Sequence, residues 1–318
     1  MKLKSLILKI TFLASLLVTC YLGFVYNMSQ TYVDRNYAKF THKAGGLILG
    51  ISRAHDGISP EIIEQEFSNS IQKPMLNFAI EKTQTSYGAV YLNAIKHKID
   101  TTSNNGLFIL SVTPGNFLIS NKIKDTANIE IDKNTIMSKL SRFNSQPNFD
   151  YIRKCYDGSL YRGLLKPQKM YINIHPNGWL EFKSKKISKE KREANKKRWM
   201  EQTNNSYQHI LKHQKKSEYR LQMFENTIEY LKNYGTVVVT RMPIDPDFLV
   251  LENDFWSNFN ERIDTISKKH KVSYLDFSTT GELYNSYDGS HLYGDSAKRF
   301  TKTLCDSIKK YQETNNYE

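Results

Sequence analysis

The sequence predicts an α/β fold in which an open parallel sheet is covered by helices on both faces. Five short apolar runs alternate along the chain with amphipathic helical stretches, a pattern typical of strands that are buried on both sides. The chain has 318 residues, which is enough to bury one large core. Ligands of such folds bind beyond the carboxyl ends of the strands, so reactive residues are expected there.

The chain opens with an apolar stretch from Ile10 to Tyr26 that follows three lysines and predicts a membrane anchor. About 20 apolar residues cross a bilayer as a helix, and the run approaches that length once residues 5–8 are added. Because the run continues past a faint lipoprotein-like box at residues 17–20, we expect it to stay uncleaved. The lysines predict a cytoplasmic N-terminus and an exported remainder.

Beyond the anchor, at residues 1–26, we expect a polar juxtamembrane stalk at 27–43 and a folded domain at 44–318. The strands of this domain are short apolar runs bounded by glycine, proline or polar residues. They are expected at Gly46–Ile51, Met75–Ile80, Gly106–Val112, Thr236–Thr240 and Val272–Phe277.

Helices are expected between and after these strands. Ser59-Pro60-Glu61 combines a capping serine, a proline at the first helical position and an acid in the first turn, which indicates a helix start. The other helices follow from residues at helical spacing. They are residues 87–97, a helix with Leu221, Phe224, Ile228 and Leu231, one with Leu251, Phe255, Phe259, Ile263 and Ile266, and a last one from Asp295 with Ala297, Phe300, Leu304, Ile308 and Tyr311.

Residues 148–216 break the alternation, and we interpret them as an insertion. Met170–Ile174 and Trp179–Phe182 flank Pro176-Asn177-Gly178, which predicts a β-hairpin. The basic stretch Lys183–Arg198 follows, with nine lysines and arginines against two glutamates. The insertion is expected either to cap the site or to dock a partner.

The net charge of +13 comes in large part from that basic stretch. A nucleic-acid patch is one interpretation, but no base-reading motif accompanies it and the anchor places the domain outside the cytoplasm. We therefore expect no nucleic-acid partner, and a solvated helix near anionic lipid or an acidic glycan instead.

Cofactor and metal motifs are weak in this chain. His209 and His213 share a helical face, but the glutamate that zinc proteases carry after the first histidine is missing. There is no Gly-rich phosphate loop and no paired-cysteine motif, so we expect no cofactor and no metal. Of the three cysteines, Cys20 lies in the anchor, and whether Cys155 pairs with Cys305 stays open.

Two segments far apart in the chain carry the residues of a catalytic relay. Ser52 lies in a Gly-x-Ser turn directly after the first strand, and Asp288 precedes His291 by three residues before the last helix. A serine hydroxyl is a poor nucleophile until a base takes its proton. His291 can be that base while Asp288 holds its other ring nitrogen. The nearer pair, His55 and Asp56, is less favoured because it shares the turn of the nucleophile.

Three more residues near strand ends are candidates for binding an oxyanion or the substrate. Asn77 and Asn116 can donate side-chain hydrogen bonds to an oxyanion, although asparagine in a loop is more often a turn former. Arg241 ends the fourth strand and can clamp a carboxylate or phosphate, or form a structural ion pair.

These motifs resemble the SGNH (GDSL-like) hydrolase superfamily. Residues 49–58 look like its serine block in membrane-anchored bacterial members, and Tyr287–Leu292 matches its last block. The resemblance implies a three-layer, flavodoxin-like parallel sheet with strand order 2-1-3-4-5 and a triad of Ser52, Asp288 and His291. The second block departs from the pattern, because residues 77–80 contain no oxyanion-hole glycine. The third block has Thr113-Pro114-Gly115-Asn116 instead of Gly-x-Asn.

The resemblance also implies a function. Similar anchored proteins modify cell-envelope polymers, so we expect a serine esterase or O-acyltransferase, single-pass in the bacterial inner (cytoplasmic) membrane with its C-terminal domain outside the cytoplasm. The implied partners are an acylated or acceptor glycan, the membrane, and a multi-spanning membrane O-acyltransferase. The alternative is a binding or assembly protein for envelope glycan modification that kept the fold but lost efficient turnover.

Overall fold

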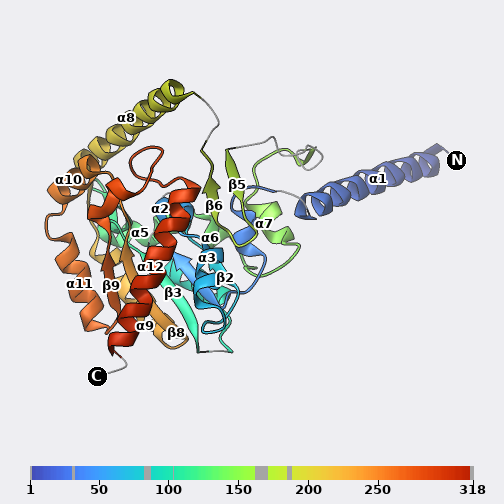
Figure 1. Ribbon diagram of the computed structural model, residues 1–318. Helices are drawn as coiled ribbons and strands as arrows, with labels where there is room; N and C mark the ends of the chain where they lie inside the picture. Colours follow the sequence, from blue (N-terminus) through green and yellow to red (C-terminus); the bar gives the residue numbers. More distant parts are fainter. Residues whose placement is uncertain are drawn as a thin grey trace.

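A five-stranded parallel sheet lies at the centre of the computed structural model, which describes residues 2–30, 33–81, 87–102, 104–161, 171–184 and 188–315 (Figure 1). The strand order is β2-β1-β3-β8-β9, which confirms the expected α/β fold class and the order 2-1-3-4-5 of the five expected strands. The strands are β1 (Gly46–Leu49), β2 (Met75–Asn77), β3 (Gly106–Ser111), β8 (Gly235–Arg241) and β9 (Ser273–Asp276).

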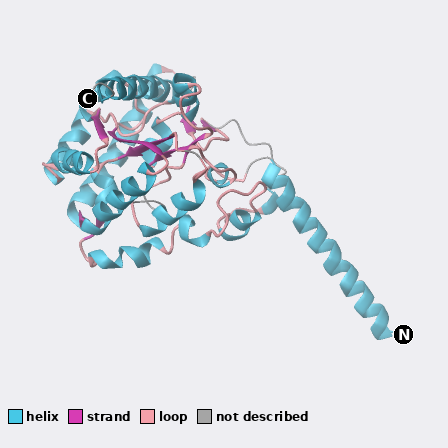
Figure 2. Cartoon of the chain, turned by 90° about the horizontal axis from the view of Figure 1, so that it is seen from below, coloured by secondary structure: helices cyan, strands magenta, loops and turns pink. Residues whose placement is uncertain are grey.

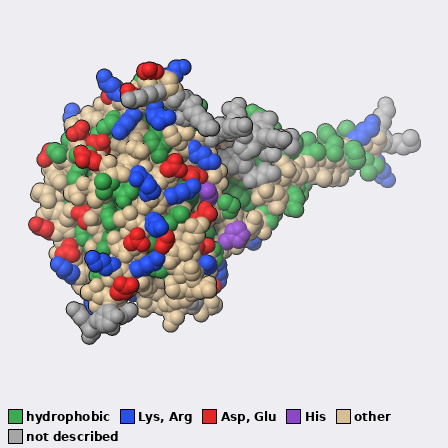
Figure 3. Space-filling model, viewed as in Figure 1, with side chains coloured by type: hydrophobic (Ala, Val, Ile, Leu, Met, Phe, Trp, Pro, Cys, Tyr) green, Lys and Arg blue, Asp and Glu red, His purple; other side chains and the backbone are tan. Residues whose placement is uncertain are grey.

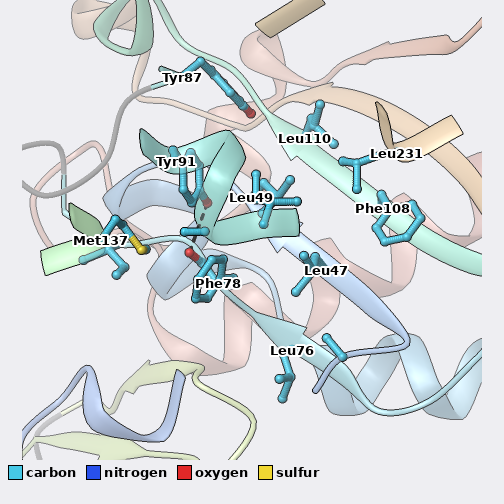
Figure 4. Close-up of a cluster of buried hydrophobic side chains, with 14 of the residues drawn as sticks. Leu47, Leu49, Leu76, Phe78, Tyr87, Tyr91, Phe108, Leu110, Met137 and Leu231 are labelled. Atoms are coloured by element: carbon cyan, nitrogen blue, oxygen red, sulfur yellow. Dashed lines mark hydrogen bonds between the residues drawn. The ribbon is translucent and has the colours of Figure 1, made fainter. Parts of the chain in front are cut away.

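Helices cover both faces of the sheet. Successive side chains of a strand point to opposite faces, so the apolar strands contribute to two buried clusters. Ile48 packs into one buried cluster with α2 (Ser52–Gly57), α3 (Pro60–Phe67) and α12 (Gly294–Asn315). Leu47 and Leu49 pack into the other, which Figure 4 shows, with α4 (Ala89–Lys98), α9 (Glu218–Lys232) and α11 (Phe259–Lys269). The apolar residues expected on the helix of residues 221–231 are all buried in this second cluster.

Helix α1 (Lys2–Gln30) extends away from the domain, as Figures 1 and 2 show. Its apolar side chains up to Leu22 are exposed, and they form the hydrophobic surface along the arm in Figure 3. Only its last turns reach the domain, where Val25 and Met28 are buried. The helix is long and apolar enough to cross a membrane, as a signal anchor or a signal sequence would be.

The chain makes a long excursion between β3 and β8. The short strands β4 (Leu118–Ser120) and β7 (Gln214–Lys216) pair antiparallel, and α9 then leads from β7 to β8. Within the excursion lie the hairpin β5 (Ile172–Ile174) and β6 (Leu180–Phe182) and the long helix α8 (Lys189–His213). The hairpin is confirmed, whereas Met170 and residues 185–187 of the basic stretch lie outside the described residues.

Short elements fill the remaining connections. They are η1 (Tyr37–Phe40), η2 (Pro114–Phe117), η3 (Asp125–Ala127), α5 (Asn128–Asp132), α6 (Ile136–Lys139), α7 (Phe149–Lys154), α10 (Pro246–Phe255) and η5 (Ser278–Leu283).

Two helix expectations need correction. The apolar stripe from Leu251 to Ile266 belongs to two helices, α10 and α11, because Trp256 leaves helical geometry (φ −144°, ψ 78°) and turns into the core against Phe259. In the last helix, Tyr311 is 41% exposed and does not join the buried face.

Candidate active site

Ser52 is placed at the carboxyl edge of the sheet by a sharp turn after β1. Gly50 has φ +136°, and a Cβ atom at this position would lie 3.0 Å from the carbonyl oxygen of Ser111 on the neighbouring strand. The turn therefore requires glycine, and it starts α2 at Ser52. His291 arrives from the loop between η5 and α12, after β9.

Ser52, His291 and Asp288 form a continuous hydrogen-bonded chain. The Ser52 Oγ lies 2.8 Å from His291 Nε2, and His291 Nδ1 lies 2.7 Å from Asp288 Oδ2. The other carboxylate oxygen of Asp288 accepts the backbone N–H groups of Ser290 and His291, at 2.9 and 2.8 Å. Asp288 is thus fixed in position and holds the N–H of the His291 ring at Nδ1, which leaves Nε2 as an acceptor for the serine proton.

The electrostatics of the pair suit a general base. Burial disfavours the charged imidazole, but the charge of Asp288 and its hydrogen bond outweigh burial and raise the pKa of His291 above its ordinary value of 6.5. Burial also opposes the charge of Asp288, but His291 and the two backbone N–H groups hold the pKa of Asp288 below 3.8. At neutral pH Asp288 is therefore ionised beside a histidine whose pKa it raises.

Tyr287 packs on the ring of His291. The two rings are nearly parallel, with an interplanar angle of 13° and centroids 5.6 Å apart. The Tyr287 hydroxyl donates to Asp56 Oδ2 at 2.7 Å. Burial raises the pKa of Asp56 to about 6, because the nearby charges and the bond from Tyr287 compensate only part of the lost hydration.

Directly beside Ser52, Arg53 is locked in a buried ionic cluster. Its guanidinium lies 2.5 Å from Glu252 Oε1 and donates to Ser290 Oγ and to the hydroxyl of Tyr207 on α8. Arg241 binds the second oxygen of Glu252 at 2.8 Å. Burial raises the pKa of Glu252, but the two arginines outweigh burial and keep it below its ordinary value. The cluster joins α2, α8, α10 and the end of β8.

A cavity of about 610 Å³ opens on Ser52 and His291. It lies among α2, the Thr113–Gly115 segment, α8, α10 and the loop that carries Asp288. Cavities of this size are typical of small-molecule sites. Helix α8, from the expected insertion, forms a long wall of the cavity, and so this part of the insertion lies against the site.

The three other predicted site residues lie in different settings. Asn77 is fully buried, and its Nδ2 donates to the carbonyls of Ala54 and Ile58, so it ties the end of β2 to α2. Arg241 is buried in its ion pair with Glu252, and the structure does not bring either Asn77 or Arg241 to the cavity wall.

Asn116 lies just behind the cavity wall. Its Oδ1 accepts the backbone N–H of Thr113 at 2.8 Å, while its Nδ2 is buried without a hydrogen-bond partner among the described residues. The preceding residues, Thr113 to Gly115, line the cavity. Asn116 itself is buried and does not line the cavity, so its role as an oxyanion donor stays a prediction.

The other residues that the sequence offered for catalysis, metal binding or a disulfide have different surroundings. His55 is buried, with Nδ1 3.3 Å from Asp56, and burial lowers its pKa, so it is neutral. The rings of His209 and His213 are 4.6 Å apart, but no group of three possible metal ligands occurs in the described part of the chain. Cys155 and Cys305 are both free thiols.

Compared with known proteins, the chain matches no family model, and a search among curated proteins also finds no match. The SGNH resemblance therefore stays a prediction.

Arg53, Tyr207, Glu252 and Tyr287 are the site residues that sequence reasoning did not single out. Arg53 and Glu252 are 199 positions apart, and no local pattern links them. A sequence pattern could have identified the face of α8 that lines the cavity. One helical face is predicted by four residues at intervals of four, Trp199, Thr203, Tyr207 and Leu211. The surrounding lysines and arginines obscured it.

Proposed function

We propose that this chain is a membrane-anchored, extracytoplasmic serine esterase or O-acyltransferase of the SGNH type, acting on a cell-envelope polysaccharide or a similarly acylated glycan. The observation that carries the proposal is the hydrogen-bonded chain from Ser52 through His291 to Asp288, which opens on a cavity. The long exposed apolar helix α1 supports the anchor, and the lysines before it favour export of the domain.

In the proposed reaction, Ser52 Oγ attacks the carbonyl carbon of an ester while its proton passes to His291 Nε2. The bond to the alcohol then breaks, and the departing alcohol takes that proton, which leaves an acyl group on Ser52. Water or a sugar hydroxyl next attacks the acyl carbon and gives its proton to His291. Release of the ester or acid returns that proton to Ser52. Asp288 stays ionised and stabilises the imidazolium throughout.

A binding or assembly role is the second candidate, and one observation favours it. Asn77 is committed to the backbone of α2, so Asn116 is left as the predicted side-chain donor for an oxyanion. Loss of one oxyanion donor costs about 10²–10³ in rate in serine hydrolases, which would leave a weak enzyme.

Labelling with a fluorophosphonate probe tests the proposal on the full-length chain. We expect covalent labelling at Ser52 that is lost in Ser52→Ala and in His291→Ala. His97→Ala is the matched control, because His97 is an exposed histidine on α4 and its loss should leave labelling unchanged. Folded protein that is not labelled, or equal labelling of the His291→Ala variant, favours the binding role.

A further inference from the structure

The cavity beside Ser52 is elongated along α8. Its wall includes residues of this helix from Trp199 to Leu211. With a rise of 1.5 Å per residue, these twelve steps span roughly 18 Å. The wall is therefore much longer than a two-carbon acyl group needs.

Contacts of α8 show where the reactive residues lie along this wall. Tyr207 donates to Glu252 at 2.8 Å and contacts the guanidinium of Arg53, the neighbour of Ser52. Trp199 lies two turns earlier, with its ring 5.9 Å from that of Tyr287, which stacks on His291. The Trp199 end thus lies on the His291 side, and the part of α8 after Tyr207 continues along the cavity wall away from Trp199.

The two ends differ in chemistry. Near His291 the wall is aromatic and polar, with Phe182, Trp199 and Gln202. Beyond Tyr207 it is apolar, with Ile210 and Leu211 on α8, joined by Leu118 and Phe255. Leu118 belongs there because β4 pairs with β7, which directly follows α8. Covering apolar surface of this kind with hydrocarbon removes it from water, which is favourable.

The direction of the reaction assigns the two ends. The alcohol that leaves or enters must lie at His291 Nε2, which exchanges protons with it, so the acyl chain must extend from Ser52 in another direction. We propose that the apolar end, formed by Leu118, Ile210, Leu211 and Phe255, holds an aliphatic acyl chain of several carbons, and that the aromatic end receives the alcohol. This inference rests on the proposed function and adds the class of acyl group.

Hydrolysis of p-nitrophenyl acetate, butyrate and octanoate by the full-length chain in lipid nanodiscs tests it. Each methylene that becomes buried should raise kcat/KM roughly fourfold until the apolar end is full. Leu211→Trp fills part of this end, and we expect it to lower the octanoate-to-acetate ratio of kcat/KM about tenfold or more. Gln208→Trp places the same ring on an exposed part of α8 outside the cavity and should keep the wild-type ratio.

The outcomes separate the inference from the proposed function. If Ser52 is labelled by the fluorophosphonate probe but acetate is the best ester, the acyl-chain inference is overturned and the esterase stands. The same holds if Leu211→Trp leaves the ratio unchanged. If no ester is cleaved and Ser52 is not labelled, both are overturned.

Discussion

Asp288 and Asp56 both act on His291, yet their environments drive their pKa values in opposite directions. Asp288 accepts hydrogen bonds from the His291 ring and from two backbone N–H groups, at 2.7 to 2.9 Å. Asp56 receives one bond of this quality, from the hydroxyl of Tyr287 at 2.7 Å, and its contact with His55 is longer, at 3.3 Å. The pKa of Asp288 falls below 3.8, and that of Asp56 rises to about 6.

This difference shows that the charge of a nearby histidine alone does not keep a buried carboxylate ionised. Burial raises the pKa of both groups and the charge of His291 lowers it in both, but only Asp288 also accepts the ring and two backbone N–H groups that complete the reversal. A carboxylate that orients imidazole must stay charged through the reaction. Asp288 meets this requirement, while Asp56 supports the ring of Tyr287 behind the histidine.

The largest effect is expected from Asp288→Asn, which removes the charged carboxylate that binds His291 Nδ1. The asparagine amide would donate toward His291 Nδ1 and favour the tautomer with its proton on Nε2, which cannot accept a proton from Ser52. We expect kcat for ester hydrolysis to fall by about 10⁴-fold with the fold retained, because the equivalent change in serine proteases has that size. A loss below tenfold would show that Asp288 is not the orienting group.

Asp56→Asn should change stability, with a sign opposite to that of Asp288→Asn. Because the pKa of Asp56 is raised from 3.8 to about 6, its stabilising contribution is complete below pH 3.8 and is lost as pH rises through about 6. Asparagine mimics the neutral carboxyl group. Between pH 4 and 6 wild type should therefore lose stability that Asp56→Asn keeps. The free energy of unfolding of the variant minus that of wild type should rise over this range by at most about 3 kcal/mol.

Denaturant unfolding at several pH values measures this difference, and Asp288→Asn is its internal contrast. The lowered pKa of Asp288 stabilises the fold above pH 3.8, and that contribution is lost as pH falls through its folded-state pKa. Asp288→Asn should therefore be less stable than wild type near pH 6, and the gap should narrow toward acid. If the free energy of unfolding relative to wild type changed with pH in the same direction for both variants, the two aspartates would not have opposite pKa shifts.

The sheet and the meeting of Ser52 with His291 were predictable because both follow from local sequence. Short apolar runs bounded by glycine or proline define strands, and parallel topology places their carboxyl ends at one edge. Ser52 and His291 each follow such an end, so 239 positions of sequence separation did not hide their meeting. Gly50 was part of the predicted turn for a reason that the structure makes explicit, its positive φ.

Side-chain partnerships between different elements were not predictable, even at short separations in the sequence. From the sequence, Arg241 could bind substrate or form an ion pair, because no local pattern identifies Glu252 as its partner. Likewise, the amide of Asn77 is used by backbone carbonyls of α2, which only the packed structure brings within 3.0 Å. A strand-end position therefore predicts nearness to the site, but not which way a polar group is used.

The smallest effect is expected from Tyr287→Phe, which cuts the link between Asp56 and His291 and keeps the stacked ring. One hydrogen bond contributes about 1 kcal/mol net, so kcat/KM should fall by less than about tenfold. Tyr287 now lowers the pKa of Asp56, so its loss should raise that pKa further. Less negative charge near His291 should then shift the acidic limb of the kcat/KM profile to lower pH, since Asp56 is one of the groups that raise the pKa of His291.

Tyr287→Ala, which also removes the stacked ring, should lose more activity. A loss from Tyr287→Phe as large as that from Asp288→Asn would mean that the two aspartates orient the base together, and the distinction between them would fail.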